Sequence, residues 1–117
     1  MSLLDNPLLG RIERYLDLAA KRQELIVGNM ANVDTPGYRT RDFDFESELQ
    51  RATDQEGQPH TVEVQGLLQR ADGNNVNIDR EALLLAKTQL EFRMGAQLLR
   101  HKFQILENVI KEGGSTS

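Results

Sequence analysis

One stretch decides how this chain folds: Asn29-Met30-Ala31-Asn32-Val33-Asp34-Thr35-Pro36-Gly37-Tyr38. Thr35 precedes a proline, which pushes its backbone away from the helical conformation. Pro36 presets the first corner of a turn, and Gly37 can adopt the positive φ that the second corner of a type II turn requires. Asn32 suits the C-cap of a helix. Ten residues that specify backbone shape, without an obvious catalytic group, predict a structural joint.

The residues before this joint follow a heptad pattern. Apolar side chains recur at alternating steps of three and four residues, which is typical of a helix with one buried seam. We therefore predict an N-terminal helix within residues 1–33. Seven of the eight seam positions are apolar: Leu9, Ile12, Leu16, Ala19, Gln23, Ile26, Met30 and Val33.

The C-terminal third repeats the pattern and predicts a second helix over residues 78–112. Asp79 is the expected N-cap, Gly113-Gly114 the expected stop, and residues 113–117 a frayed tail. Because the two seams match, we predict a mainly α fold in which the terminal helices pair as an antiparallel-type coiled-coil hairpin. Nine of the ten seam positions are apolar: Ile78, Ala82, Leu85, Gln89, Phe92, Ala96, Leu99, Phe103, Leu106 and Ile110.

The second helix carries a further apolar stripe beside its seam. One partner helix covers only one stripe, and a large apolar patch left in water usually marks an interface. We favour a helix packed between subunits of an assembly over a wide helix in a compact bundle. The stripe comprises Leu83, Ala86, Leu90, Met94, Leu98, Ile105 and Val109.

The middle of the chain, residues 34–77, differs from both ends. Nine acidic and four basic residues lie between 34 and 78, and large apolar residues are sparse. We expect a turn and a polar, partly disordered segment, ordered by a partner if at all. Within it, residues 61–64 are a possible short strand, and the spacing of Phe45, Leu49 and Ala52 fits one or two helical turns, with Ser47 as a possible cap.

Composition argues against most other functions. The chain has 117 residues, a formal charge of −4 and no cysteine. Basic residues are scattered, which does not indicate a nucleic-acid partner, and no segment reaches the length of a membrane span. His60 and His101 lie in different regions, and the carboxylates of residues 42–48 lack a surrounding apolar wall. We therefore predict no enzyme, no metal or other cofactor and no small-molecule substrate.

Phe43 and Phe45 stand out because aromatic side chains are unfavourable in a polar, acidic stretch. One interpretation is that they pack back onto the helical hairpin and anchor the middle segment. The other is that Phe43, Phe45 and Leu49 form a recognition element for another protein.

The joint resembles the signature of bacterial flagellar rod and hook proteins, which carry an asparagine-rich helix end followed by Thr-Pro-Gly-Tyr or a near variant. Three further segments are similar to the proximal rod proteins of that family: residues 39–45, residues 77–81 and Ala86-Lys87. The short length also fits, whereas residues 50–75 lie outside the resemblance.

The resemblance implies a structural subunit of the flagellar basal-body rod, which links the membrane-embedded base to the hook for motility. Its partners would be further copies, other rod proteins, the base and the export machinery. Export would proceed without a cleaved signal peptide, to the rod in the periplasmic space. The resemblance also implies that the terminal helices assemble in the inner layer of the rod, and that Phe45 and Leu49 contact the export gate.

An alternative keeps the two seams but changes the class of protein. The chain could be a soluble helical adaptor, forming a dimeric four-helix bundle with a protein partner. That interpretation gives no special reason for the joint.

For the rod subunit we expect folding to be coupled to assembly, because the two seams alone hold only a marginal hairpin.

Overall fold

A computed structural model describes residues 7–51 and 57–115 of the chain. Along the chain the elements are α1 (Pro7–Ala31), β1 (Arg41–Asp42), α2 (Phe45–Arg51), β2 (Val62–Glu63) and α3 (Ile78–Ser115). The molecule is elongated, with extents of 73 × 25 × 18 Å and a radius of gyration of 19.0 Å, whereas a compact domain of this length has a radius of about 13 Å.

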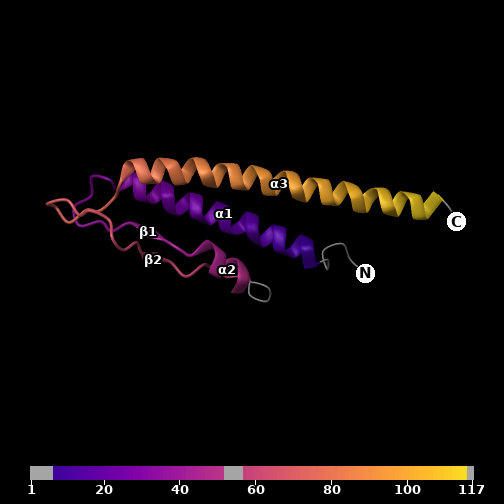
Figure 1. The fold of residues 1–117 in the computed structure, drawn as a ribbon, viewed down its shortest axis with the longest axis horizontal. Coiled ribbons are helices and arrows are strands. Elements are labelled where there is room, and N and C mark those ends of the chain that lie inside the picture. The colour runs from indigo at the N-terminus through magenta and orange to yellow at the C-terminus, as the bar shows by residue number, and fades with distance from the viewer. Residues whose placement is uncertain (1–6, 52–56, 116–117) are drawn as a thin grey trace.

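The two terminal helices form an antiparallel hairpin, as Figure 1 shows. The helices have 25 and 38 residues, which correspond to about 38 and 57 Å. Asn29 of α1 contacts Glu81 of α3, and Leu16 of α1 faces Gly95 of α3. In this register the last turns of α3 extend past the first turn of α1, as Figure 1 also shows. The predicted mainly α fold with paired terminal helices is confirmed.

The seam of α3 against α1 differs in detail from the predicted one. The sequence pattern points to Ala82, Gln89 and Ala96, but these lie one position after the residues that become buried: Glu81, Thr88 and Gly95. Gly95 explains the shift, because a Cβ built on it would lie 2.9 Å from Cδ2 of Leu16. Small and polar residues of α3 therefore face α1 and let the helices approach closely, and several of the large apolar residues of α3 remain exposed.

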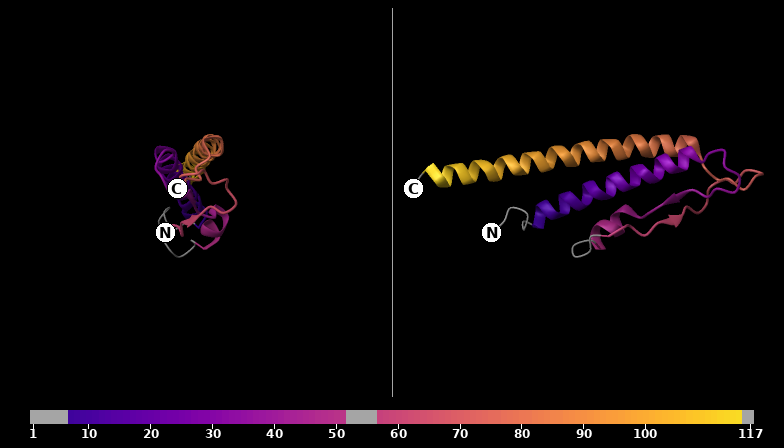
Figure 2. Two further views of the ribbon diagram at one scale, coloured as in Figure 1. Left: turned by 90° about the vertical axis from the view of Figure 1, so that its left-hand side faces the viewer. Right: turned by 180° about the vertical axis from the view of Figure 1, so that it is seen from behind.

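The apolar core belongs mainly to α1. One side of α1 packs on α3, and the middle segment folds back along another side of α1, so that α1 lies between α3 and the middle segment (Figure 2). We call residues 38–51 and 57–77 the arm. The buried apolar side chains are Leu9, Ile12, Leu18, Ala19, Ile26, Phe43 and Val76.

The arm holds the predicted short elements. β1 pairs antiparallel with β2, with Arg41 opposite Glu63 and Asp42 opposite Val62. β2 lies in the predicted strand of residues 61–64, and α2 begins at Phe45, as its spacing predicts; Ala52 is outside the described residues. α2 and β1 also contact α1, so these parts of the arm are held against the hairpin within one subunit.

Three predictions about helix ends were wrong: the N-cap of α3, the residue at which α3 ends, and the cap of α2. Asn77 caps α3, since its Oδ1 accepts the N–H of Arg80 at 3.0 Å, and the helix begins at Ile78, before the predicted cap Asp79. α3 also continues through Gly113 and Gly114 to Ser115, because helical glycine costs only about 1 kcal/mol and does not by itself end a helix. Residues 116 and 117 of the predicted tail are outside the described residues.

The third correction concerns α2. Asp44, and not Ser47, caps this helix: its carboxylate accepts the backbone N–H of Ser47 at 3.2 Å and the Ser47 hydroxyl at 2.9 Å. These hydrogen bonds lower the pKa of Asp44 below its ordinary value. A carboxylate is a better cap than a hydroxyl here because it accepts from both donors.

Candidate functional site

The predicted turn is present at the end of α1. The side-chain amide of Asn32 donates to the carbonyl of Gly28 at 2.8 Å and so caps the last turn of the helix. The backbone N–H of Tyr38 donates to the carbonyl of Thr35 at 3.2 Å, which closes a four-residue turn. Gly37 has a φ of 75°, as the second corner of a type II turn requires. The predicted conformation of Gly37 is confirmed.

The end of the arm closes over this turn. Gly73 has a φ of 87°, and a Cβ on it would lie 3.3 Å from the Cα of Gly37, so the two glycines pack backbone to backbone. The N–H of Gly37 donates to the carbonyl of Asp72 at 2.8 Å. The amide of Asn74 donates to the carbonyls of Asn32 and Thr35 at 2.9 and 2.8 Å. Two loops far apart in the sequence are thus held together by hydrogen bonds and close backbone packing.

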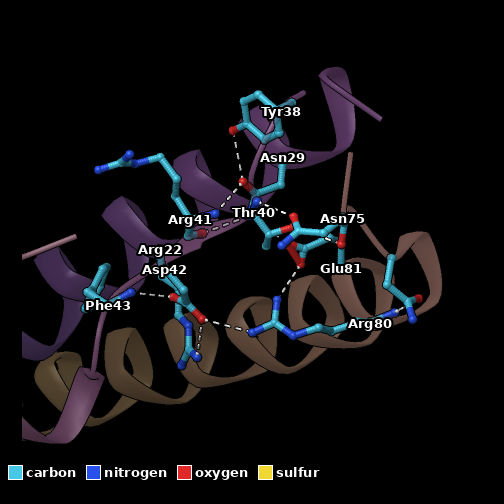
Figure 3. Close-up of polar contacts among 11 residues, drawn as sticks. Arg22, Asn29, Tyr38, Thr40, Arg41, Asp42, Phe43, Asn75, Arg80 and Glu81 are labelled. Carbon is cyan, nitrogen blue, oxygen red and sulfur yellow. Dashed lines mark hydrogen bonds and ion pairs between the residues drawn. The ribbon is translucent and has the colours of Figure 1, made fainter. Parts of the chain in front are cut away.

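Asn29 is the centre of the joint and is only 1% exposed. Its Nδ2 donates to the carbonyl of Arg41 at 2.9 Å and to Oε1 of Glu81 at 2.6 Å. Its Oδ1 accepts the hydroxyl of Tyr38 at 3.0 Å and the N–H of Arg41 at 3.1 Å (Figure 3). One side chain therefore links α1, the turn, β1 and α3.

A charged cluster lies beside Asn29, as Figure 3 shows. Asp42 pairs with Arg22 at 3.0 Å and with Arg80 at 3.5 Å, and Arg80 also pairs with Glu81 at 3.0 Å. Burial raises the pKa of Glu81 and the nearby Asp42 adds to this, although the hydrogen bonds from Asn29 and Arg80 oppose it. The cluster joins α1, β1 and α3 through side chains that are largely removed from water.

Asn75 ties the start of the arm to its end. Its Oδ1 accepts the backbone N–H of Thr40 at 2.7 Å, and its own N–H donates to the carbonyl of Tyr38 at 3.3 Å. Sequence reasoning did not identify Asn74, Asn75, Asp42 or Glu81 as parts of the joint. The asparagines at 74 and 75 were the available signal, because asparagine side chains in turns commonly form hydrogen bonds with nearby backbone groups.

The aromatic residues of the arm pack onto α1. Phe43 is buried, and its ring stacks on that of Phe45 with 6.3 Å between centroids. Phe45 meets Tyr15 of α1 edge to face at 5.2 Å. Leu49 is half-buried on the following turn of α2. This geometry supports the interpretation that Phe43 and Phe45 anchor the arm.

The remaining predicted motif residues are less enclosed. Thr35, Pro36 and Ala31 are exposed on the outside of the joint. Thr35 donates its hydroxyl to Oδ1 of Asn32 at 3.0 Å. Nothing in the described contacts explains Ala31.

The predicted seam residues fall into three groups of exposure. Leu9, Ile12 and Ile26 of α1 are buried, whereas Leu16 and Met30 of α1 and Leu85, Leu99 and Leu106 of α3 are half-buried. The exposed ones, all on α3, are Phe92, Phe103 and Ile110.

The second stripe of α3 is open to solvent along its whole length. Exposure reaches 73% at Leu83, 53% at Leu90 and 59% at Met94. In a folded chain such a continuous apolar face is typical of a protein–protein interface. All its members are exposed: Leu83, Ala86, Leu90, Met94, Leu98, Ile105 and Val109.

Other kinds of site find little support in the part of the chain that the structure describes. Within residues 7–51 and 57–115 no three His, Asp or Glu side chains are grouped so as to hold a metal ion. No helix in those ranges is long and apolar enough to cross a membrane.

Comparison with known proteins finds several relatives that share one description. The chain is 35% identical to the flagellar basal body rod protein FlgB of Salmonella typhimurium, over 86% of this chain and 91% of that protein. It is also 35% identical to the Escherichia coli protein of the same name, with the same coverage. FlgB of Borreliella burgdorferi is 29% identical over 84% of this chain and 91% of its own length. No protein-family model matches the chain.

Proposed function

The chain belongs to the family of the flagellar basal body rod protein FlgB and is a structural subunit of that rod, and we propose that it enters the rod through its two terminal helices. The observation that carries this proposal is the open apolar face of α3. Leu83, Leu90 and Met94 lie in water in the single chain. Burying each of them would stabilise an assembly by roughly 1–3 kcal/mol.

The joint supports the same proposal because its polar groups are already paired within one subunit. Asn29, for example, is hydrogen-bonded to Tyr38, Arg41 and Glu81. A rigid joint fixes the angle at which the arm leaves the hairpin. Neighbouring subunits can then pack against a surface of defined shape.

Assembly would complete the ordering of the C-terminal end of α3. The last turns of α3 extend beyond α1 and lack the burial that stabilises most helices in proteins. Packing between neighbours would supply that burial, so we infer that helicity of the chain rises as it assembles. Complete helicity in a dilute, monomeric sample would contradict this part of the proposal.

The remaining roles follow from the family and extend the proposal to its surroundings. As a rod subunit the chain would link the membrane-embedded base to the hook, in the periplasmic space, and support motility. It would reach the rod through the flagellar export machinery without a cleaved signal. Phe45 and Leu49 would contact the export gate only when the arm is released, because Phe45 packs on Tyr15 in the folded chain.

The test is a gene replacement with the triple variant Leu83→Gln, Leu90→Gln, Met94→Gln. We expect loss of swimming in soft agar and incomplete rods in electron micrographs of isolated basal bodies. A matched triple variant on the arm, Val62→Gln, Leu68→Gln and His60→Gln, alters exposed residues away from α3 and is expected to swim. Complete rods in the α3 variant would contradict assembly through this face.

A further inference from the structure

α3 turns a polar, small-residue face toward α1 although it carries more apolar faces. Glu81, Thr88 and Gly95 follow each other at intervals of seven residues and are buried, with Glu81 0% and Thr88 1% exposed. Phe92, on the more apolar seam that the sequence predicts, is 40% exposed. Burial of apolar surface alone would favour the opposite arrangement, so other contacts must set the orientation of α3.

The predicted and the observed seams differ by one residue, which corresponds to a rotation of α3 by about 100° about its own axis. The facing side of α1 does not choose between them, because Ile12 and Ile26 are apolar and would pack against either face. A rotation would bring Ala82, Gln89 and Ala96 to α1 and would turn the second stripe by the same angle. The orientation of α3 therefore decides where the second stripe faces.

Close packing at Gly95 opposes this rotation. A Cβ built on Gly95 would lie 2.9 Å from Cδ2 of Leu16 and 3.1 Å from Cδ1 of Tyr15, so these two side chains fill the space that a further side chain would need. The ring of Tyr15 also meets Phe45 of the arm edge to face at 5.2 Å. In the rotated orientation Ala96 would take the place of Gly95, and its methyl group would press against Leu16 and Tyr15.

Hydrogen bonds at Glu81 stabilise the observed orientation, as Figure 3 shows. Its Oε1 accepts from the amide of Asn29 at 2.6 Å, and its Oε2 accepts from Arg80 at 3.0 Å. Arg80 also lies 3.5 Å from Asp42 of β1. A rotated α3 would place Ala82 opposite Asn29, whose buried amide would then lose an acceptor. Buried polar groups can select one arrangement of helices over others that bury as much apolar surface.

We propose that Gly95 and Glu81 are the positions that select the orientation of α3, and that they thereby fix the direction in which the second stripe faces relative to α1 and the arm. Glu81 stabilises the observed orientation, and the tight packing over Gly95 disfavours the rotated one. The consequence for assembly rests on the proposed function, because neighbours would meet the stripe from one direction only. The orientation itself belongs to the single chain and is testable without assembly.

The test uses the reactivity of two adjacent thiols, because the chain contains no cysteine. Thr88→Cys places a thiol at a buried position and Gln89→Cys at an exposed one. We expect a maleimide to label Gln89→Cys at least tenfold faster than Thr88→Cys in the dilute, purified full chain. Adding Gly95→Leu should speed labelling at position 88 and slow it at position 89, each at least threefold, because the two positions exchange burial on rotation.

The matched control is Gly28→Leu, at a glycine of α1 whose added Cβ would meet no atom within 4 Å. It should leave both labelling rates unchanged. Leucine favours a helix more than glycine does, so an effect of Gly95→Leu does not come from helix propensity. If circular dichroism shows that Gly95→Leu does not fold, Gly95→Ala decides, since its single methyl group meets the same contacts and should shift both rates in the same directions.

The contribution of Glu81 has its own pair of variants. Glu81→Ala removes the acceptor of Asn29 and should shift the two labelling rates in the same directions as Gly95→Leu. Glu81→Gln keeps an oxygen that can accept from Asn29, so the rates should stay close to those of the parent chain. Unchanged rates in Glu81→Ala would overturn the role of Glu81.

The remaining outcomes separate the orientation from the proposed function. A folded Gly95 variant that keeps the parent rates would overturn the role of Gly95, and so would a rise of both rates together, which indicates a loosened hairpin. Exchanged rates in a Gly95→Leu strain that swims normally would overturn the consequence for assembly. Complete rods in the triple variant of the second stripe would contradict the proposed function, whereas the orientation of α3 in the single chain would stand.

Discussion

The joint and the second apolar stripe of α3, which forms the outer face of that helix, are opposite in character. At the joint, polar and charged side chains are buried, and Asn29 and Glu81 are 1% and 0% exposed. On the outer face of α3, large apolar side chains such as Leu90 and Met94 are exposed. A typical single domain has the reverse arrangement, with apolar residues inside and charged residues in water.

The difference shows which parts of the structure a single chain can complete. Hydrogen bonds at the joint join residues of the same chain, so its shape does not depend on a neighbour. The apolar face of α3 is exposed in the part of the chain that the structure describes, residues 7–51 and 57–115. If the subunit enters the rod as we propose, it combines a joint that is closed before assembly with a surface that becomes buried during it.

The largest expected effect is at the joint, from Asn29→Ala. This substitution removes four hydrogen bonds and leaves the buried carboxylate of Glu81 with one partner fewer. We expect a loss of about 3 kcal/mol in the free energy of unfolding, measured by urea titration with circular dichroism at low concentration. Asn108→Ala, on the exposed surface of α3, is the matched control and should change stability by less than about 0.5 kcal/mol. Equal effects at the two positions would remove the distinction between joint and outer face.

Sequence reasoning identified the joint but only part of its construction. Thr35-Pro36-Gly37 predicts a turn because those residue types restrict φ and ψ locally, whatever surrounds them. The roles of Asn74, Asp42 and Glu81 depend on tertiary contacts between residues that lie 20 to 52 positions apart in the sequence, for which local propensity carries no signal. The closure of the joint therefore needed the structure.

The helices show the same limit. Heptad spacing predicts that α1 and α3 exist and pair, but it does not specify which face of a doubly apolar helix meets its partner. Gly95 decides this, because the absence of a side chain lets Leu16 and Tyr15 approach. Periodicity counts apolar residues, and so it placed the seam of α3 one position too late.

The second prediction tests the backbone of the joint. Gly37→Val places a β-branched residue at a φ of 75°, and Gly73→Ala combines a φ of 87° with an approach of 3.3 Å to Gly37. Each should reduce the free energy of unfolding by about 2 kcal/mol. Gly28→Ala in α1 has no atom within 4 Å of its new Cβ and should instead stabilise by up to about 1 kcal/mol. A thermal melt that ranks the three variants otherwise would show that the turn is adaptable.

The third prediction concerns the pH dependence of stability. Burial raises the pKa of Glu81 above its ordinary value of 4.5, so the folded chain holds this proton more tightly than the unfolded chain. Its contribution should therefore fall as pH rises from 4.5 through the raised pKa. Hydrogen bonds from Ser47 lower the pKa of Asp44, whose contribution is present above its ordinary value of 3.8 and is lost as pH falls through the lowered pKa.

Two variants separate these opposite slopes. Glu81→Gln should remove the decline of stability above pH 4.5, and Asp44→Asn should remove part of the loss at acid pH. The measurement is the slope of the free energy of unfolding against pH, which is less sensitive than its absolute value to the other contacts that each substitution alters. A slope above pH 4.5 that is unchanged in Glu81→Gln would show that this carboxyl does not titrate as its burial implies.

The smallest expected effect is on the outer face of α3, from the double variant Leu90→Gln, Met94→Gln. Both side chains are more than half exposed, and glutamine has nearly the helix propensity of leucine and methionine. The free energy of unfolding of the monomer should therefore change by less than about 0.5 kcal/mol. Leu18→Gln, at a fully buried position of α1, should by contrast cost about 3 kcal/mol, because it removes apolar contacts and buries an amide. If the double variant destabilises the dilute monomer as strongly as Leu18→Gln does, the α3 face is already covered within one chain, and its exposure cannot be the reason that subunits assemble.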